Sequence, residues 1–301
     1  MGKSRHGGRH HDHSRSASPA GFTRGPDLPG TPLATWHQHG LALGRIPAFR
    51  DNYIWLVGQA GGSLTVAVDP GEAEPLERLL DAQGLSLAAI LLTHHHADHV
   101  GGVARLLERF PGIPVFGPTL ESITGVTRPL AGGETLDVPG LPVPLRVLTV
   151  PGHTRGHLAY YLEPGPGAAP GLLFCGDTLF GLGCGRLFEG SPGQMHASLA
   201  SLAALPENTL VFCAHEYTLL NLPFAEAVDP DNTVLAQRGE EIRRLRARGE
   251  ATVPMPLALE RATNPFLRCA EPALAAVVAD MAPDGDPVAV FAALREWRNR
   301  W

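Results

Sequence analysis

The feature that most constrains the fold is a series of short β-rich segments separated by turn residues. Between some of them apolar residues recur at helical spacing, at 74–83, 101–110 and 193–204. Hairpin-like strand pairs mixed with helical crossovers predict layered sheets with helices outside, and not a uniform βαβ repeat. The expected strands cover residues 53–57, 64–69, 88–93, 113–116, 145–150, 158–162, 172–175 and 210–213.

The two ends of the chain follow other patterns. Residues 1–40 are rich in His, Ser, Gly and Pro and have almost no apolar periodicity, so we expect a disordered N-terminal extension. After His215 the pattern becomes helical. An amphipathic charged helix is expected within 229–248, where Asp-Pro-Asp-Asn provides a helix start, and further helices fit 271–281 and 287–298.

Composition excludes several classes of partner. The 301 residues carry a formal net charge of −6, which argues against nucleic acid and anionic membranes. No apolar run approaches the roughly 18 residues that a membrane span needs. The four cysteines lie far apart without a CxxC pair, which favours a reducing compartment. We therefore expect a soluble cytoplasmic monomer with neither nucleic acid nor a membrane as its partner.

A cluster of potential metal ligands follows the expected strand 88–93 directly. His94 and His96 are two residues apart, so in an extended segment their side chains project to the same side. Asp98 and His99 fall where the chain turns into the next helix. One loop can therefore provide ligands to two neighbouring ions.

Three further candidates each follow an expected strand. His153 comes after 145–150, Asp177 after 172–175 and His215 after 210–213. Rigid strands can bring ligands together at one rim of a sheet. Each signal is weak alone, because a lone His-x-His or Gly-Asp is usually a surface or turn feature. Together they predict a site for two divalent metal ions, with zinc first and iron or manganese compatible with the same ligands.

Neighbouring polar residues are expected to play supporting parts. His95 alternates away from the residues beside it and His157 lies four residues after His153, so we expect both to be packed or supporting side chains. Asp69 is either a turn former or a carboxylate that supports a ligand, and we favour the second. Cys184 is expected to be a small packed residue.

Five motifs resemble the metallo-β-lactamase superfamily and, within it, the hydroxyacylglutathione hydrolase (glyoxalase II) family. The resemblance covers roughly residues 41–301, and HxHxDH alone marks only the superfamily. It implies an α+β fold: a four-layer αβ/βα sandwich over 41–216, followed by a helical substrate-binding domain over 217–301. The motifs are THHHADH (93–99), GHTRGH (152–157), CGDTLFGLGCGR (175–186), HEYT (215–218) and NPFLR (264–268).

The resemblance also implies a ligand set and a reaction. The ligands would be His94, His96 and His153 on one metal, Asp98, His99 and His215 on the other, and Asp177 bridging both. Asp98 and Asp177 would be the catalytic carboxylates around a bridging water or hydroxide. The reaction would be hydrolysis of S-D-lactoylglutathione to glutathione and D-lactate, the second step of methylglyoxal detoxification.

Glutathione carries two carboxylates, so its binding needs local positive charge. The positions that the resemblance assigns to it are Arg186, Tyr217, Arg295 and Arg298. Arginine stands at both positions where the family uses lysine, which keeps the charge and adds bidentate capacity. Phe188 stands where many relatives have tyrosine, so no hydroxyl contact is expected there. Asn264 is expected to end a loop and anchor the helical domain.

Three alternative functions remain open at this point. A mononuclear iron persulfide dioxygenase would keep the fold but would not need the full second set of ligands. A lactonase or β-lactamase would not need the arginine-bearing C-terminus. A metal-binding scaffold without catalysis would have no evident need to maintain so many buried polar groups.

Overall fold

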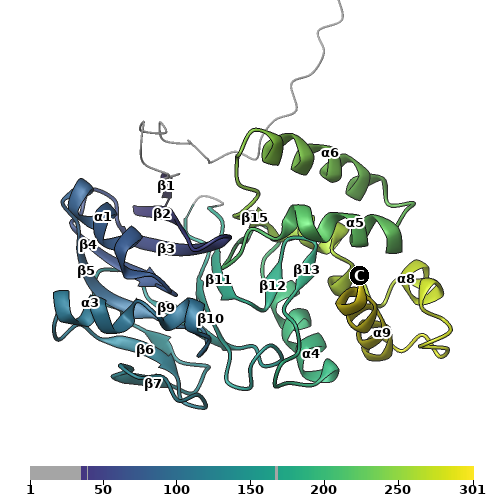
Figure 1. Cartoon of the computed structure of the whole chain (residues 1–301), viewed down its shortest axis with the longest axis horizontal. Helices are drawn as coiled ribbons and strands as arrows, with labels where there is room; N and C mark the ends of the chain where they lie inside the picture. The colour runs from purple at the N-terminus through teal and green to yellow at the C-terminus, as the bar shows by residue number, and fades with distance from the viewer. Residues whose placement is uncertain (1–34, 39, 167–168) are drawn as a thin grey trace, which may run out of the picture.

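Two β-sheets form the centre of the molecule in the computed structural model, which describes residues 35–38, 40–166 and 169–301 (Figure 1). The first sheet has the order β1-β2-β3-β4-β5-β6-β7 and the second the order β15-β14-β11-β10-β9-β8, and a separate hairpin joins β12 and β13. The first sheet comprises β1 (Thr35–Gln38), β2 (Leu41–Ala48), β3 (Asn52–Gln59), β4 (Leu64–Val68), β5 (Ser86–Leu91), β6 (Val115–Pro118) and β7 (Arg128–Leu130). The remaining strands are β8 (Thr135–Leu136), β9 (Leu145–Thr149), β10 (Leu158–Leu162), β11 (Leu172–Gly176), β12 (Leu179–Phe180), β13 (Gly183–Cys184), β14 (Leu210–Cys213) and β15 (Met255–Pro256).

Helices cover the outer sides of the sheets. Figure 1 shows α1 and α3 beside the first sheet, and α5, α6, α8 and α9 gathered at the opposite side of the molecule. The helices are α1 (Ala73–Gln83), α2 (Ala97–Val100), α3 (Val103–Arg109), α4 (Pro192–Ala203), α5 (Thr218–Val228), α6 (Thr233–Ala247), α7 (Leu257–Thr263), α8 (Pro272–Val277) and α9 (Pro287–Arg300), with a 3-10 turn at Pro265–Leu267.

The alternation of side chains along β3 divides the interior into two cores. Trp55 and Val57 belong to the core shared with the second sheet, whereas Ile54 and Leu56 belong to the core beneath α1 and α3. Successive strand residues point to opposite faces, so a strand buried on both sides must be apolar throughout. The expected four-layer αβ/βα arrangement is thus confirmed, and α4 joins the core of the second sheet through residues such as Leu199.

Strand direction decides where the polar segments meet. β4, β5 and β6 run parallel to one another, and β11 runs parallel to β14. The carboxyl ends of parallel neighbours lie at the same edge of a sheet, so the segments that follow β4 and β5 are adjacent, as are those that follow β11 and β14. This edge of each sheet carries the polar cluster described below.

The eight strands expected from the sequence are all present. Strand β2 and the short strands β7, β8, β12, β13 and β15 were not expected. Helix α5 was also missed, because it is apolar on most sides and contains Pro223, so its sequence lacks the polar face that marks a surface helix. Most of the expected disordered extension lies outside the described residues, but the expectation is wrong for residues 35–38, which form β1 and pair with β2.

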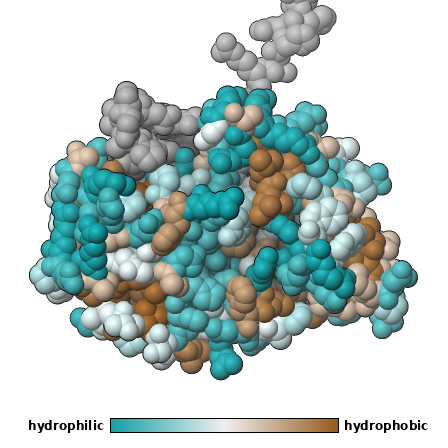
Figure 2. Space-filling model, in the orientation of Figure 1, coloured by the Kyte–Doolittle hydropathy of each residue, from teal (hydrophilic) through white to brown (hydrophobic). Residues whose placement is uncertain are grey.

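The helical part of the chain is joined to the second sheet. Strand β15 pairs with β14 through Val211 and Met255, so residues after 216 contribute a strand as well as helices. The division of the chain at residue 216 stays a prediction. Among the described residues no helix is both long and apolar enough to cross a bilayer. The face shown in Figure 2 is largely hydrophilic, and its exposed hydrophobic residues form several separate patches.

Candidate metal centre

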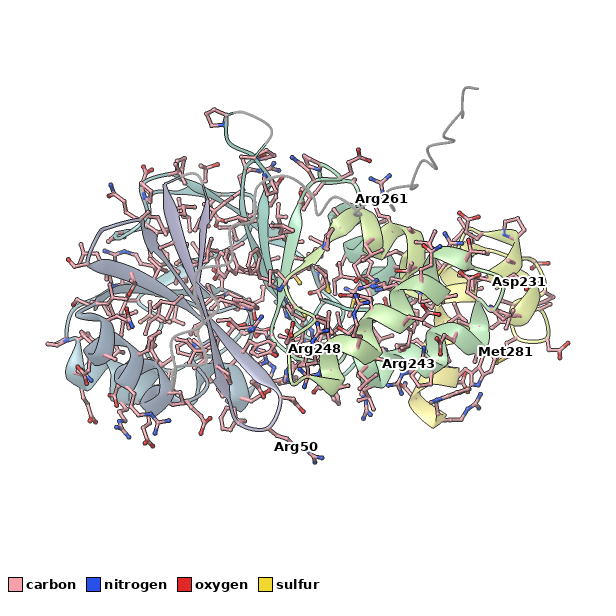
Figure 3. All side chains as sticks on the ribbon, turned by 90° about the horizontal axis from the view of Figure 1, so that it is seen from above. Arg50, Asp231, Arg243, Arg248, Arg261 and Met281 are labelled. Atoms are coloured by element: carbon pink, nitrogen blue, oxygen red, sulfur yellow. The ribbon has the colours of Figure 1, made fainter. Side chains whose placement is uncertain are left out.

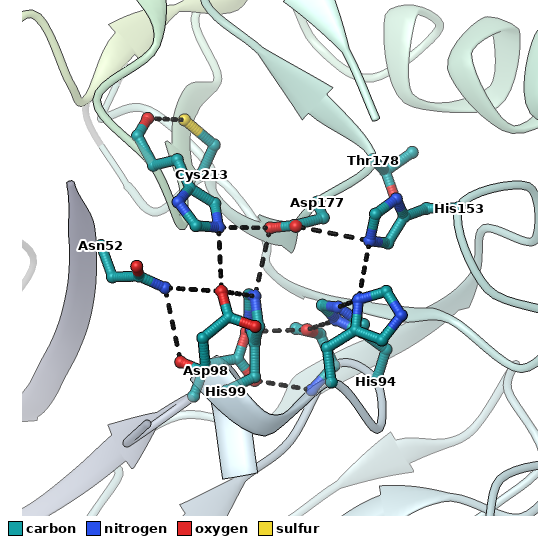
Figure 4. Close-up of polar contacts among 12 residues, drawn as sticks. Asn52, His94, Asp98, His99, His153, Asp177, Thr178 and Cys213 are labelled. Carbon is teal, nitrogen blue, oxygen red and sulfur yellow. Dashed lines mark hydrogen bonds and ion pairs between the residues drawn. The ribbon is translucent and has the colours of Figure 1, made fainter. Parts of the chain in front are cut away.

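The ends of four strands bring the predicted ligands together. His94 follows β5, His153 follows β9, Asp177 follows β11 and His215 follows β14, while Asp98 and His99 lie on the short helix α2. Figure 4 shows these side chains converging from both sheets. Convergence from rigid elements fixes the relative positions of the donor atoms before any ion binds.

Three histidines form the first group of donors. The Nδ1 atom of His96 lies 3.1 Å from Nε2 of His94 and 3.1 Å from Nε2 of His153. Zinc–nitrogen bonds of 2.0–2.1 Å in tetrahedral geometry place neighbouring ligand atoms about 3.3 Å apart. Both distances are close to this spacing, and the three ligand nitrogens lie within 4.8 Å of one another, so they can share one ion.

Asp98, His99 and His215 form the second group. The Oδ2 atom of Asp98 lies 3.5 Å from Nε2 of His99 and 3.4 Å from Nε2 of His215. One carboxylate and two imidazoles suit zinc, iron or manganese. The side chains of both histidines are nearly inaccessible to solvent.

Asp177 lies between the two groups. Its Oδ2 is 3.4 Å from Nε2 of His153, and its Oδ1 is 3.4 Å from Nε2 of both His99 and His215. Nε2 of His99 and Oδ1 of Asp177 are buried and have no hydrogen-bond partner within the described part of the chain. A buried polar atom without a partner is costly, so a cation at these atoms fits the site.

The electrostatics of the cluster follow from its mixed charges. Burial opposes ionisation of Asp177, but His99 and His215 hold the pKa of this carboxyl well below its usual value. Burial also lowers the pKa of His94 far below its usual value, and the neighbouring His99 adds to this effect. His94 is therefore neutral at physiological pH, which is the form that binds a metal.

Hydrogen bonds on the side away from the metal centre orient the ligand side chains. Asp69 follows β4 directly and accepts hydrogen bonds from the backbone N–H and the hydroxyl of Thr93, at 2.8 and 2.7 Å. Its Oδ2 also lies 2.9 Å from Nδ1 of His99. Such a contact fixes the orientation of the imidazole and leaves Nε2 facing the cluster. Nδ1 of His94 lies 3.0 Å from the Thr93 hydroxyl.

Sequence reasoning missed two further residues of this kind. Oδ1 of Asp51 lies 2.9 Å from Nδ1 of His215, and the side-chain amide of Asn52 donates to Oδ2 of Asp98 at 2.9 Å. Asp51 ends the turn between β2 and β3 and Asn52 begins β3, and two polar residues at such a place ordinarily indicate only a turn. No local signal distinguishes them, because their partners lie far away in the sequence.

His157 and His95 occupy different environments. His157 is buried, its ring stacks on that of His94 with centroids 4.6 Å apart, and its Nε2 accepts from the backbone N–H of Asp177 at 3.2 Å. His95 instead points to the surface and pairs with Glu189 at 2.5 Å. His95 and Glu189 also lie within 4.8 Å of a ring nitrogen of His96, at the exposed side of the first group.

The closeness of β13 to the ligands explains a glycine of the GCGR motif. A Cβ atom at Gly185 would lie 2.0 Å from the carbonyl oxygen of Asp177 and 3.0 Å from Nδ1 of His153. That nitrogen already contacts the carbonyl oxygen of Arg186 at 2.8 Å. Only glycine therefore allows the chain to pass this close to the cluster.

A cavity of about 600 Å³ opens beside the cluster and is lined by His153, Asp177 and the four residues that the resemblance assigns to glutathione, Arg186, Tyr217, Arg295 and Arg298. The ring of Tyr217 stacks on that of His215, with centroids 4.6 Å apart and 9° between the planes. Burial lowers the pKa of Arg298, and the positive charges of Arg295 and Arg186 lower it further. These three guanidiniums thus form a cationic group that favours an anionic ligand.

In the wall of the cavity, Arg295 packs against Cys184. Nη1 of Arg295 donates to the carbonyl oxygen of Cys184 at 2.9 Å, and its guanidinium lies 5.1 Å from the ring centroid of Phe266. Its Nε is buried without a hydrogen-bond partner in the described residues. The Cys184 thiol is buried and burial raises its pKa, as expected for a packed residue, although no sequence pattern predicted the arginine beside it.

Two exposed side chains lie at the mouth of the cavity. Phe188 is 62% exposed, and its ring centroid lies 5.5 Å from that of His96 and 5.3 Å from that of His153. Arg50 lies at the tip of the β2–β3 turn and points away from the body of the protein in Figure 3. It contributes to the lining of the cavity and was not among the expected residues.

Comparisons with known proteins agree with this geometry. A model of the hydroxyacylglutathione hydrolase C-terminus matches residues 216–301, and one of the metallo-β-lactamase superfamily matches residues 48–215. The hydroxyacylglutathione hydrolase of Dechloromonas aromatica is 53% identical and covers 86% of this chain and 99% of its own. That of Alkalilimnicola ehrlichii is 55% identical, with coverages of 85% and 97%.

Solved structures show the same architecture. The B3 metallo-β-lactamase BLEG-1 is similar with a TM-score of 0.55 at 23% identity, covering 75% of this chain and 99% of that one, which is a likeness of fold alone. The fold is therefore the α+β metallo-β-lactamase fold with a C-terminal helical region. The family models and the relatives above show that the chain belongs to the hydroxyacylglutathione hydrolase family of the metallo-β-lactamase superfamily.

Proposed function

We propose that this protein hydrolyses S-D-lactoylglutathione, and similar 2-hydroxyacyl glutathione thioesters, to glutathione and the free 2-hydroxy acid. The proposal places the chain at the second step of methylglyoxal detoxification. One observation carries it: a cavity lined by four arginines opens beside seven side chains with metal-binding donor atoms. The relatives named hydroxyacylglutathione hydrolase support the same reaction.

Two divalent ions fit the donor atoms, and we propose zinc first, with iron or manganese also compatible. His94, His96 and His153 would hold one ion, and Asp98, His99 and His215 the other, with Asp177 shared. Such ions supply an activated water and stabilise negative charge on the thioester oxygen when bound. Asp98 and Asp177 are the proposed catalytic carboxylates, because their negative charges hold the cations at the reacting centre.

The side chains of the protein would bind and orient the substrate. Arg186 and Arg298 face the cavity and would bind the carboxylates of glutathione, with Arg295 adding positive charge from the wall. Tyr217 would contact the peptide while its ring keeps His215 in place. The leaving thiolate has a pKa near 8.5, so the C–S bond can break without a strong general acid.

Purified protein with its metal content measured should release thiol from S-D-lactoylglutathione, followed with a thiol-reactive dye. A sample that contains two metal ions per chain and turns over none of this thioester would reject the proposal. One iron per chain together with oxygen uptake on glutathione persulfide would instead support the persulfide dioxygenase. Equal activity on small neutral esters or lactones would favour a lactonase.

We propose further that the enzyme works as a monomer in the cytoplasm. The ligand set and the cavity are built from one chain, so a second subunit is not needed to complete them. All four cysteines are free and buried, which agrees with a reducing compartment. Light scattering on a size-exclusion column tests the oligomeric state, and a dimer mass would contradict this part of the proposal.

A further inference from the structure

The segment that carries His215 is paired with the start of β3. His215 and Asn52 form an antiparallel bridge, in which the N–H of Tyr53 donates to the carbonyl of Ala214 at 2.7 Å and the N–H of Glu216 donates to that of Asp51 at 2.9 Å. Neighbouring residues of an extended segment point to opposite sides. His215 therefore faces the metal centre while Glu216 points away from it.

On that opposite side the carboxylate of Glu216 collects hydrogen bonds from two distant segments. Oε2 accepts from the Tyr53 hydroxyl at 2.8 Å and from the backbone N–H of Thr252 at 3.0 Å. Oε1 accepts from the Thr252 hydroxyl. The side chain is only 7% exposed, and Nη1 of Arg246 lies 4.0 Å from Oε2. The carboxylate is thus nearly fully paired within the protein.

The same contacts extend to the start of α5. The hydroxyls of Thr252 and Thr218 lie 2.6 Å apart. Since Thr252 has one hydroxyl proton and gives it to Glu216, Thr218 must be the donor in this pair. Hydrogen bonds therefore fix the HEYT motif at Glu216 and at Thr218, on either side of Tyr217. None of these groups touches a ligand atom of the metal centre.

We propose that Glu216 is a positioning residue for its two neighbours, the ligand His215 and the cavity residue Tyr217. Three donors from β3 and the 250–254 segment fix the carboxylate, and the carboxylate fixes the backbone between the two rings. The rings can then stay stacked at 4.6 Å, so one contact network sets both the second group of metal donors and one wall of the cavity. This inference rests on the proposed function only for the choice of glutathione as the ligand.

The test compares Glu216→Gln and Tyr53→Phe with Glu77→Gln as a matched control. Glutamine keeps the size of Glu216 but cannot accept all three bonds, and Tyr53→Phe removes one donor only. Glu77 is also a carboxylate with little exposure, 10%, paired with Arg105 on the outer helices α1 and α3. It therefore controls for the loss of a buried charge away from the site.

Glu216→Gln should lower the metal content from two ions towards one per chain after dialysis. It should also raise the dissociation constant of glutathione by about 3- to 10-fold, which is below the roughly 10- to 100-fold effect typical of groups that touch a metal-ligand side chain directly. Tyr53→Phe should also lower the metal content and raise the dissociation constant of glutathione, but by less than Glu216→Gln. Glu77→Gln should change neither.

The proposal would be overturned if both test variants kept a metal content and a glutathione affinity within twofold of the parent protein and lost only stability. If Glu216→Gln does not fold, Tyr53→Phe decides by the same criteria. Metal loss in a protein without thioesterase activity would sustain the inference while rejecting the proposed function, because metal content does not depend on the substrate.

Discussion

At the scale of single residues, the metal centre depends on hydrogen bonds to the imidazole nitrogens that face away from it. His99 contacts Asp69 and His215 contacts Asp51, each at 2.9 Å. These contacts set which ring nitrogen faces the ions. The two carboxylates differ in accessibility, since Asp69 is buried whereas the side chain of Asp51 is 37% exposed.

Asp51→Ala should weaken metal binding at the second group of donors. Removal of the carboxylate frees the ring of His215 to rotate, and the loss in metal affinity or activity should be about 10- to 100-fold. Metal titration with a competing chelator measures it. Glu189→Ala is the matched control, because Glu189 also pairs with a histidine, His95, at similar exposure. Equal metal affinity in both variants would contradict the role of Asp51.

Metal binding to the metal-free protein should release protons. Burial would lower the pKa of His215, but Asp177 and hydrogen bonds to Asp177 and Asp98 raise it to about 10. Burial likewise opposes protonation of His99, yet Asp177 and Asp69 raise its pKa well above the usual value. Both rings are protonated at neutral pH, so a bound ion must displace these protons.

Metal affinity should therefore increase as the pH rises from about 6 to about 9, because proton competition for the imidazoles weakens as the pH approaches their raised pKa values. Calorimetric titration in buffers of different ionisation enthalpy gives the number of protons released. A binding enthalpy that does not change with the buffer would show that the histidines are neutral before the metal binds.

At the scale of elements, α9 combines a structural face with a substrate-binding face. Phe291 and Leu294 are completely buried, whereas Arg298 lines the cavity and donates to Oδ1 of Asn221 at 3.2 Å. Deletion of the chain after Phe291 would expose the core and would also remove the positive charge of Arg298. A point substitution therefore separates substrate binding from stability.

Arg298→Ala should raise KM for S-D-lactoylglutathione by about 10-fold or more, the effect of losing one hydrogen bond to a charged group, with little change in kcat. Hydrolysis of a small neutral thioester should be unaffected. Arg300→Ala is the control, since Arg300 lies on the same helix and pairs with Glu296 at the surface. Equal losses with both substrates would mean that the cavity does not bind glutathione.

At the scale of the whole molecule, a buried polar network joins the helical part to the hairpin β12–β13. The side chain of Glu260 is completely buried and pairs with Arg238, whose side chain is 5% exposed. Oε2 of Glu260 accepts from the backbone N–H of Leu182 at 3.0 Å. The side-chain amide of Asn264 donates to the carbonyls of Phe180 and Gly183, so Asn264 anchors the helical part as expected.

Arg238→Met should destabilise the protein by about 3–5 kcal/mol, because it leaves the buried carboxylate of Glu260 without its partner. Urea unfolding measures the change. The control is Arg243→Met, since Arg243, labelled in Figure 3, pairs with Glu226 at the surface and should contribute under about 1 kcal/mol. Similar losses in both variants would show that Glu260 is reached by water or another cation.

The sequence by itself determined eight of the described strands, the layers and which residues carry candidate metal-binding atoms. Runs such as 88–93 and 172–175 can be buried on both faces only inside a layered fold, and His94 and Asp177 follow the ends of these two strands. These properties are local, because hydrophobic periodicity and ligand chemistry belong to neighbouring residues.

Only the tertiary structure decided which distant groups meet. Asp51 lies 164 positions from His215 and Arg295 lies 111 from Cys184, and at such separations a single sequence carries no pairing signal. Helix α5 and strand β15 were missed for the same reason, since burial by the rest of the chain stabilises them more than their own propensity does. Packing thus set the positions of groups whose chemistry the sequence already contained.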